Sequence, residues 1–222
     1  MDETLARIAC MKLLIVTQAV DADDSDLGFF IRWIEEFAKH CERVEVICLK
    51  HGRSDLPKNV RVYSLGKDTG VSRIKYVWNF YRYIWNLWHE YDAVFVHMNP
   101  EYSILGGPLW RLWGKKIALW YTHKSVNLKL RIAVAFADII FTASKESFRL
   151  HTKKLHIMGH GIDTNFFSPD SSIARGDWML SVGRLMKSKR HDLAIREAAK
   201  EGKEVRIAGE GPERANLESL AH

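Results

Sequence analysis

The residues best suited to chemistry lie in one short basic segment near the end of the chain. Residues 181–185 read Ser-Val-Gly-Arg-Leu, and Lys189 follows shortly after them. A strand at this point would deliver a glycine turn, an arginine and a lysine to the start of the next helix. Backbone amides at a helix start, together with two cations, form a site for a diphosphate. An ordinary cationic loop has the same composition, so spacing alone leaves both interpretations open.

A second glycine turn, at residues 209–211, follows the next expected strand. The carboxyl ends of neighbouring parallel strands meet at one edge of a sheet, and ligand crevices in open α/β folds lie at that edge. The two turns together therefore favour a ligand site.

The elements that must position these residues alternate between strand and helix. Short apolar runs without internal alternation are typical of strands covered by helices on both faces of a parallel sheet. We expect a doubly wound, Rossmann-like α/β domain over residues 1–158. Its strands are expected at 12–17, 44–49, 60–64, 93–97, 116–121 and 139–142, and its helices at 27–40, 72–90, 103–113, 128–136 and 145–150.

A linker and a smaller unit follow that domain. Residues 159–177 hold glycines, a proline and a Ser/Asp cluster without a periodic apolar face, which predicts an interdomain linker. Residues 178–222 then form a partial second Rossmann-like lobe. Such a unit rarely holds a core alone, and its exposed sheet edge predicts self-association into a homo-oligomer. Its elements are expected at 178–182 (strand), 183–190 (loop), 191–201 (helix), 205–208 (strand) and 213–221 (helix).

The composition excludes several classes of protein. The 222 residues carry a net charge of +6 and are 47% hydrophobic, too apolar for a disordered chain. The three cysteines, Cys10, Cys41 and Cys48, have no metal-ligand spacing and are expected to be free thiols in a reducing compartment. We find no secretory signal or membrane span and expect a cytoplasmic protein. Acidic and basic residues are interleaved, so we expect no nucleic-acid partner.

Three ordered motifs carry a family resemblance. They are Gly-Ile-Asp-Thr-Asn-Phe-Phe-Ser-Pro at 161–169, Val-Gly-Arg-Leu at 182–185 with Lys189, and Ile-Ala-Gly-Glu-Gly-Pro at 207–212. In this order the chain resembles the retaining glycosyltransferases of the GT-B fold, family 4, also called the group 1 type. Looser matches lie at 92–97, 121–123 and 137–144, so the resemblance covers nearly the whole chain.

The resemblance implies a retaining hexosyl-type glycosyltransferase. Such an enzyme would transfer a sugar from a nucleotide diphosphate sugar to a glycan or lipid-linked glycan, as in polysaccharide biosynthesis, without a metal or other cofactor. Arg184 and Lys189 would hold the diphosphate and offset charge on the leaving group. His123, at a strand end, would contact the transferred sugar as the catalytic residue. The glycines that would let the backbone approach the donor are Gly183, Gly209 and Gly211.

Two features depart from the family pattern. The family has a glycine pair after its first strand, where an acceptor or phosphate meets backbone amides, and here only Gly28 stands at that place. The family's later motif, two glutamates separated by seven residues, has no counterpart before His222. The donor site would then be completed by another chain, or the sequence is a fragment, or activity is lost. The last case describes a second hypothesis, a non-catalytic membrane-surface or subunit partner that keeps the fold.

An aromatic stripe with basic neighbours occupies the helix expected at 72–90. Tryptophans with cations can lie at a membrane interface, which would suit a lipid-linked acceptor and the inner face of a membrane. Aromatic stripes also commonly fill the core over a sheet, and both roles stay open. Trp78, Trp85 and Trp88 are the residues expected to contact a membrane. The other members are Ile74, Tyr81, Ile84, Arg73, Lys75 and Arg82, and Trp110, Trp113, Lys115 and Lys116 repeat the pattern.

Overall fold

The computed structural model describes residues 11–173 and 176–221. Cys10, two positions of the expected linker and His222 lie outside the described residues. The chain divides into two compact units, Met1–Gly161 and Ile162–His222. None of the described helices has the length and apolar character needed to cross a bilayer.

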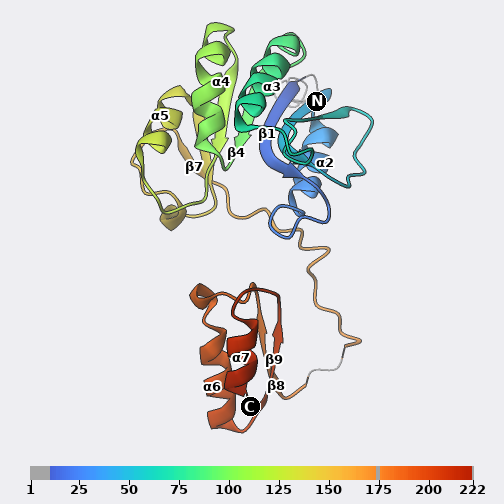
Figure 1. The fold of residues 1–222 in the computed structure, drawn as a ribbon, viewed down its shortest axis with the longest axis vertical. Coiled ribbons are helices and arrows are strands. Elements are labelled where there is room, and N and C mark those ends of the chain that lie inside the picture. The colour runs from blue at the N-terminus through green and yellow to red at the C-terminus, as the bar shows by residue number, and fades with distance from the viewer. Residues whose placement is uncertain (1–10, 174–175, 222) are drawn as a thin grey trace. The chain divides into compact units, whose positions relative to one another are not determined.

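The first unit contains one sheet of seven parallel strands in the order β3-β2-β1-β4-β5-β6-β7 (Figure 1). The predicted doubly wound α/β fold is confirmed here, because the strand order reverses between β1 and β4. The strands are β1 (Lys12–Val20), β2 (Arg43–His51), β3 (Val60–Ser64), β4 (Ala93–His97), β5 (Lys116–Trp120), β6 (Ile139–Thr142) and β7 (Leu155–Ile157). The helices are α2 (Phe30–His40), α3 (Arg73–Asn86), α4 (Pro100–Leu112) and α5 (Leu128–Phe136).

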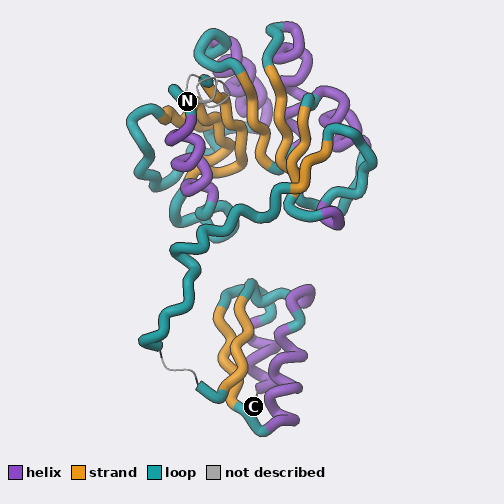
Figure 2. The backbone as a smooth tube through the Cα atoms, turned by 180° about the vertical axis from the view of Figure 1, so that it is seen from behind, coloured by secondary structure: helices purple, strands orange, loops and turns teal. Residues whose placement is uncertain are grey.

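Helices cover both faces of this sheet. Figures 1 and 2 show α2 on one face and α3, α4 and α5 on the other. Successive strand residues are therefore buried in different cores: Leu14 packs with Phe80 and Trp110, and Ile15 packs with Phe30. Burial on both faces is the physical reason for the continuous apolar runs in the sequence.

Several expected boundaries are wrong for local reasons. The helix expected from residue 27 begins at Phe30, because the Asp24 carboxylate accepts the amides of Asp26 and Leu27 in a turn. The helix expected from 103 begins at Pro100, which suits a first helical position.

Two expectations near the end of the unit are also corrected. The helix expected at 145–150 is only a 3₁₀ turn, Lys145–Ser147. The strand Leu155–Ile157 was not predicted, because three residues are too few to show a period.

The second unit is a two-stranded parallel sheet with helices on one face (Figure 2). It consists of β8 (Trp178–Val182), the 3₁₀ turn η2 (Lys187–Lys189), α6 (His191–Glu201), β9 (Glu204–Ala208) and α7 (Arg214–Ala221). Leu185, Ile195 and Ala198 are buried, whereas Leu180 and Val182 are exposed on the other side of the sheet.

Candidate functional site

Two glycine loops meet at the carboxyl edge of the β8–β9 sheet. The amide of Gly183 donates to the carbonyl of Ala208 at 3.0 Å, and the amide of Leu185 donates to the carbonyl of Glu210 at 2.9 Å. Gly209 has a φ of +157°, and a side chain there would collide with the carbonyl oxygen of Gly183. Only glycine allows this close backbone approach. The two loops therefore form one continuous backbone surface.

Gly211 and Lys189 extend that surface. A Cβ atom on Gly211 would lie 2.5 Å from the carbonyl oxygen of Leu185. A Cβ atom on Gly183 would lie 3.9 Å from Cδ of Lys189, so the exposed lysine side chain lies beside this glycine. Arg184 is exposed on the same loop. The structure thus brings the residues predicted to hold a donor to one edge of the second unit.

A buried histidine, which the sequence analysis did not single out, supports the first of these loops. His191 is 3% exposed at the start of α6. Its Nε2 atom lies 3.2 Å from the carbonyl oxygen of Arg184, and its Nδ1 atom lies 2.8 Å from Oγ of Ser181. A carbonyl oxygen can only accept, so Nε2 donates. In the neutral ring Nδ1 then accepts from the serine hydroxyl, and His191 ties the loop to both β8 and α6.

The loop at residues 183–190 is strongly cationic. It carries two arginines and two lysines and no acidic residue. Arg190, in the left-handed conformation at φ +55°, is held by Asp192 through two hydrogen bonds of 3.0 and 3.1 Å. These bonds lower the pKa of the Asp192 carboxyl. This edge of the second unit therefore attracts anions.

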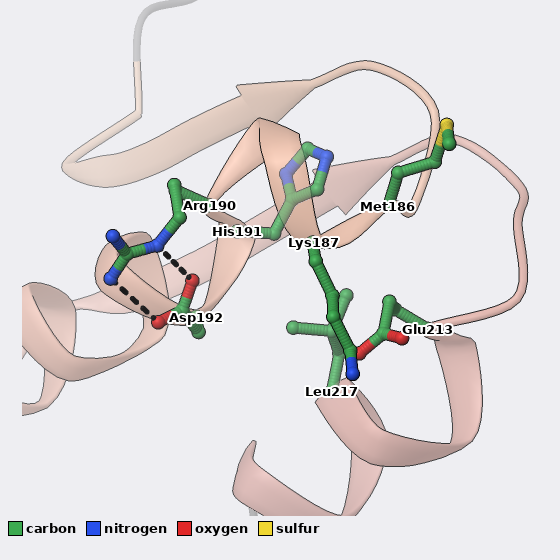
Figure 3. A pocket seen from close by; sticks show the side chains of 7 residues that line it. All are labelled: Met186, Lys187, Arg190, His191, Asp192, Glu213 and Leu217. Carbon is green, nitrogen blue, oxygen red and sulfur yellow. Dashed lines mark hydrogen bonds and ion pairs between the residues drawn. The ribbon is translucent and has the colours of Figure 1, made fainter.

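A pocket of about 400 Å³ lies between the starts of α6 and α7 (Figure 3). Lys187 and Arg190 bring positive charge to it, and Asp192 and Glu213 bring negative charge. Because these charges balance, the pocket differs from the cationic loop beside it, and neither Arg184 nor Lys189 lines it. Its lining is Met186, Lys187, Arg190, His191, Asp192, Glu213 and Leu217.

The first unit has its own candidate region, at the strand ends where the order reverses. His97 ends β4, is 2% exposed, and its Nδ1 atom lies 3.1 Å from Oγ1 of Thr17 on β1. Its ring stacks on Phe30 with centroids 4.0 Å apart. Burial lowers the pKa of His97 to about 4, so the imidazole is neutral near pH 7. Sequence reasoning missed this histidine as a site residue, although its place at the end of an apolar strand was visible.

The residue after His97 is strained. Met98 has a φ of +64°, and the amide of Asn99 donates to the carbonyl of His97 at 2.8 Å across it. A non-glycine residue in such a tight turn stores conformational energy, and positions of this kind cluster at functional sites.

Gly28 lies in an acidic loop, and close packing accounts for the glycine. A Cβ atom there would lie 2.8 Å from the carbonyl oxygen of Asp24 and 2.9 Å from that of Ala22. Residues 21–29 contain four aspartates and no cation. The cations that pair with this loop come from outside it: Lys50 with Asp21 at 3.0 Å and Arg53 with Asp23 at 2.6 Å.

His123 lies just past the end of β5 and is exposed. The amide of Ser125 donates to its Nδ1 atom at 3.1 Å. Nδ1 therefore carries no proton, and the single N–H of the ring is at Nε2. The side chain can donate one hydrogen bond from Nε2 to a ligand at this edge.

Comparison with known proteins identifies a shared fold. HepE of Anabaena in complex with UDP superposes with a TM-score of 0.69 at 14% identity, over 95% of this chain and 64% of HepE. MurG of Acinetobacter baumannii superposes with a TM-score of 0.52 at 14% sequence identity, over 94% of this chain and 62% of MurG. The UDP-GlcNAc 2-epimerase of Methanocaldococcus jannaschii superposes with a TM-score of 0.51 at 11% sequence identity, over 94% of this chain and 67% of the epimerase. The chain thus spans about two thirds of the length of these proteins.

At these identities the likeness shows the fold alone, a Rossmann-like α/β fold shared with GT-B neighbours. No family model matches the chain, and no curated protein matches it.

Proposed function

We propose that this chain is a nucleotide-sugar-dependent glycosyltransferase that transfers a hexosyl group with retention. The observation that carries the proposal is the joining of two glycine loops, Arg184 and Lys189 at the carboxyl edge of the second unit. Its support from known structures is that HepE, of the same fold, was solved with UDP and with UDP-glucose.

The proposed mechanism uses the cationic loop for the leaving group. A nucleoside diphosphate gains negative charge as its bond to the sugar breaks. Arg184 can donate two hydrogen bonds to a diphosphate through its planar guanidinium, and Lys189 adds a point charge beside Gly183. These cations would offset the developing charge without a metal ion. Gly209 and Gly211 let their loop pack directly on the backbone of Gly183 and Leu185, and this packing would hold the cationic loop in place for the donor.

The proposed sugar contact comes from the first unit. His123 presents an N–H at Nε2, which can donate to a sugar hydroxyl. Residues 21–29 carry four aspartates and no cation of their own, and the neighbouring Lys50 and Arg53 already pair with Asp21 and Asp23. This edge of the first unit would therefore suit a neutral glycan better than a diphosphate.

The proposal is tested by calorimetric titration of the purified chain with UDP, GDP and ADP. The double variant Arg184→Ala, Lys189→Ala should weaken binding about 100-fold, because it removes two charge-assisted contacts. The matched control is Arg196→Ala, Lys200→Ala, which removes one arginine and one lysine from the exposed side of α6 and should leave affinity unchanged. If the chain binds none of the nucleotides, the proposal is overturned. If both double variants bind equally well, the nucleotide site does not include Arg184 and Lys189.

A second test follows the reaction. Incubation of a bound nucleotide sugar with glycan and lipid-linked acceptors should release nucleotide diphosphate, and NMR of the product should show the donor's anomeric configuration. His123→Ala should lower turnover more than nucleotide affinity. The rival function is a non-catalytic partner at a membrane surface, favoured by the exposed tryptophans of α3, and release of nucleotide diphosphate coupled to product formation excludes it.

A further inference from the structure

Helix α3 exposes a row of large apolar side chains. Its buried face, with Phe80 and Ile84, packs on the sheet, and the opposite side faces solvent. Trp78 is 68% exposed and Trp85 is 61% exposed, so these rings do not fill the core. The exposed row, called the α3 face below, consists of Ile74, Val77, Trp78, Tyr81 and Trp85, with Trp88 in the turn that follows the helix.

The α3 face continues onto the neighbouring helix. The ring of Trp113, after the end of α4, lies 5.7 Å from that of Trp85 and 5.8 Å from that of Trp88. The hydroxyl of Tyr81 donates to the carbonyl of Leu105 in α4 at 3.1 Å. Both helices lie on the same face of the sheet (Figure 1), so the aromatic surface is broad rather than a single ridge.

The charges on helix α3 itself have one sign. Helix α3 contains Arg73, Lys75 and Arg82 and no acidic residue. Lys75 and Arg82 are seven residues apart, which is two helical turns, so they lie on one flank of the aromatic row. A protein partner of mixed charge would gain little binding affinity from such a flank. An anionic lipid surface attracts every cation on it, so each one adds to the affinity.

We propose that the α3 face docks on the surface of a bilayer that contains anionic lipid. Indole rings have an apolar body and an N–H donor, and they sit at the level of the lipid headgroups. The lysine and arginine side chains beside them reach the lipid phosphates. A helix that lies flat in this way brings its own beginning, at Ser72, to the same level.

The groove beside the start of α3 fits this orientation. It has a volume of about 510 Å³ and lies between the first turns of α3 and α4. Leu65, Val77 and Phe80 form part of its apolar wall. Its charged lining is two cations, Lys67 and Arg73, and one carboxylate, Glu101. Docking by the α3 face therefore brings a largely apolar groove, with two basic residues and one acidic residue, to the headgroup layer, next to the strand ends of the first unit.

Vesicle sedimentation tests the proposal. The chain should sediment with vesicles of phosphatidylcholine and phosphatidylglycerol and far less with vesicles of phosphatidylcholine alone. Lys75→Glu, Arg82→Glu should reduce partitioning at least about 30-fold, since each of the two lost cations contributes about fivefold and each new glutamate adds repulsion. The charge-matched control is Arg196→Glu, Lys200→Glu on α6, which should bind as the parent protein does.

The aromatic part is tested with Trp78→Ser, Trp85→Ser, whose side chains are exposed, so the fold should persist by circular dichroism. Its control is Phe166→Ser, Phe167→Ser, two rings that are 62% and 69% exposed outside α3. Bromolipids should quench the tryptophan fluorescence of the control and not that of the α3 variant.

Two results overturn the proposal. One is equal partitioning of the α3 variants and their controls. The other is a concentration-dependent dimer, seen by light scattering, that the α3 variants abolish while vesicles are not bound, which would make the face an interface between copies. Vesicle binding is measured without nucleotide, so its failure is distinguishable from failure of the proposed glycosyltransferase.

Discussion

Acidification should destabilise the first unit through His97. The pKa of this buried imidazole is lowered from 6.5 to about 4, and the cause is desolvation. In the unfolded chain the same ring titrates near its ordinary value of about 6.5. Below that pH the unfolded state binds a proton that the native state does not, so stability is complete above about pH 6.5 and is lost as the pH falls toward 4. The loss amounts to about 2 kcal/mol by pH 5 and about 3 kcal/mol near pH 4.

The assay is urea unfolding between pH 7.5 and pH 5, followed by circular dichroism. His97→Asn keeps a hydrogen-bonding side chain beside the hydroxyl of Thr17 but cannot titrate, so it reports the contribution of every other group over the same range. The difference in slope between parent and variant isolates the histidine. Parallel curves for the two proteins would refute the reasoning, because they would mean that His97 binds its proton equally well in the folded and unfolded states.

Substitutions at three further positions test the packing. His191→Leu should lower the stability of the second unit by about 2 kcal/mol, because it removes two hydrogen bonds. His191→Gln can still donate to the Arg184 carbonyl and should restore part of that stability. Unfolding is followed by ¹⁹F NMR of a fluorotryptophan at Trp178, and an equal loss of stability in both variants would contradict the role of His191 in holding the loop. Gly209→Ala should cost about 2 kcal/mol or more in the same assay, because its Cβ meets backbone; an unchanged midpoint would contradict the close approach. Trp110→Phe should cost about 1–3 kcal/mol in urea unfolding of the first unit, because the buried hydroxyl oxygen of Tyr91 loses its donor and keeps only its own bond to the carbonyl of Ile84; a neutral effect would contradict the bond.

The sequence predicted the large elements well because each carries its own periodic signal. The strands at 60–64, 93–97 and 139–142 and the helix at 128–136 have the predicted bounds. Elements that rest on few residues, such as β7, or on side chain to backbone bonds, such as the turn before α2, left no period to read. Repeated local patterns in the sequence therefore predict the fold, whereas a short strand or the first residue of a helix depends on single contacts that leave no such pattern.

The candidate site was predictable only in part. Glycines and cations in strand-end loops were visible, because their residue types are unusual at that place. The hydrogen bonds of His191 were not, since a histidine at a helix start gives no sign of the partners it meets across ten residues. Likewise, Trp78 and Trp110 share one aromatic pattern in the sequence, yet the first is 68% exposed and the second is fully buried. Periodicity places a ring on a helix face and does not say which face meets the sheet.

The two sheet edges at which the proposed diphosphate could bind differ in charge. The β1–α2 loop has four aspartates and no cation, and the loop after β8 has four cations and no acid. Moving the phosphate site to the first unit would place its anion against Asp23 and Asp24, whose pKa values are lowered by hydrogen bonds and which are therefore ionised at neutral pH. Exchanging Arg184 and Lys189 for alanine should thus weaken nucleotide binding about 100-fold, whereas exchanging Asp23 and Asp24 for asparagine should leave it unchanged. Loss of affinity in the asparagine variant would instead assign the nucleotide to the first unit.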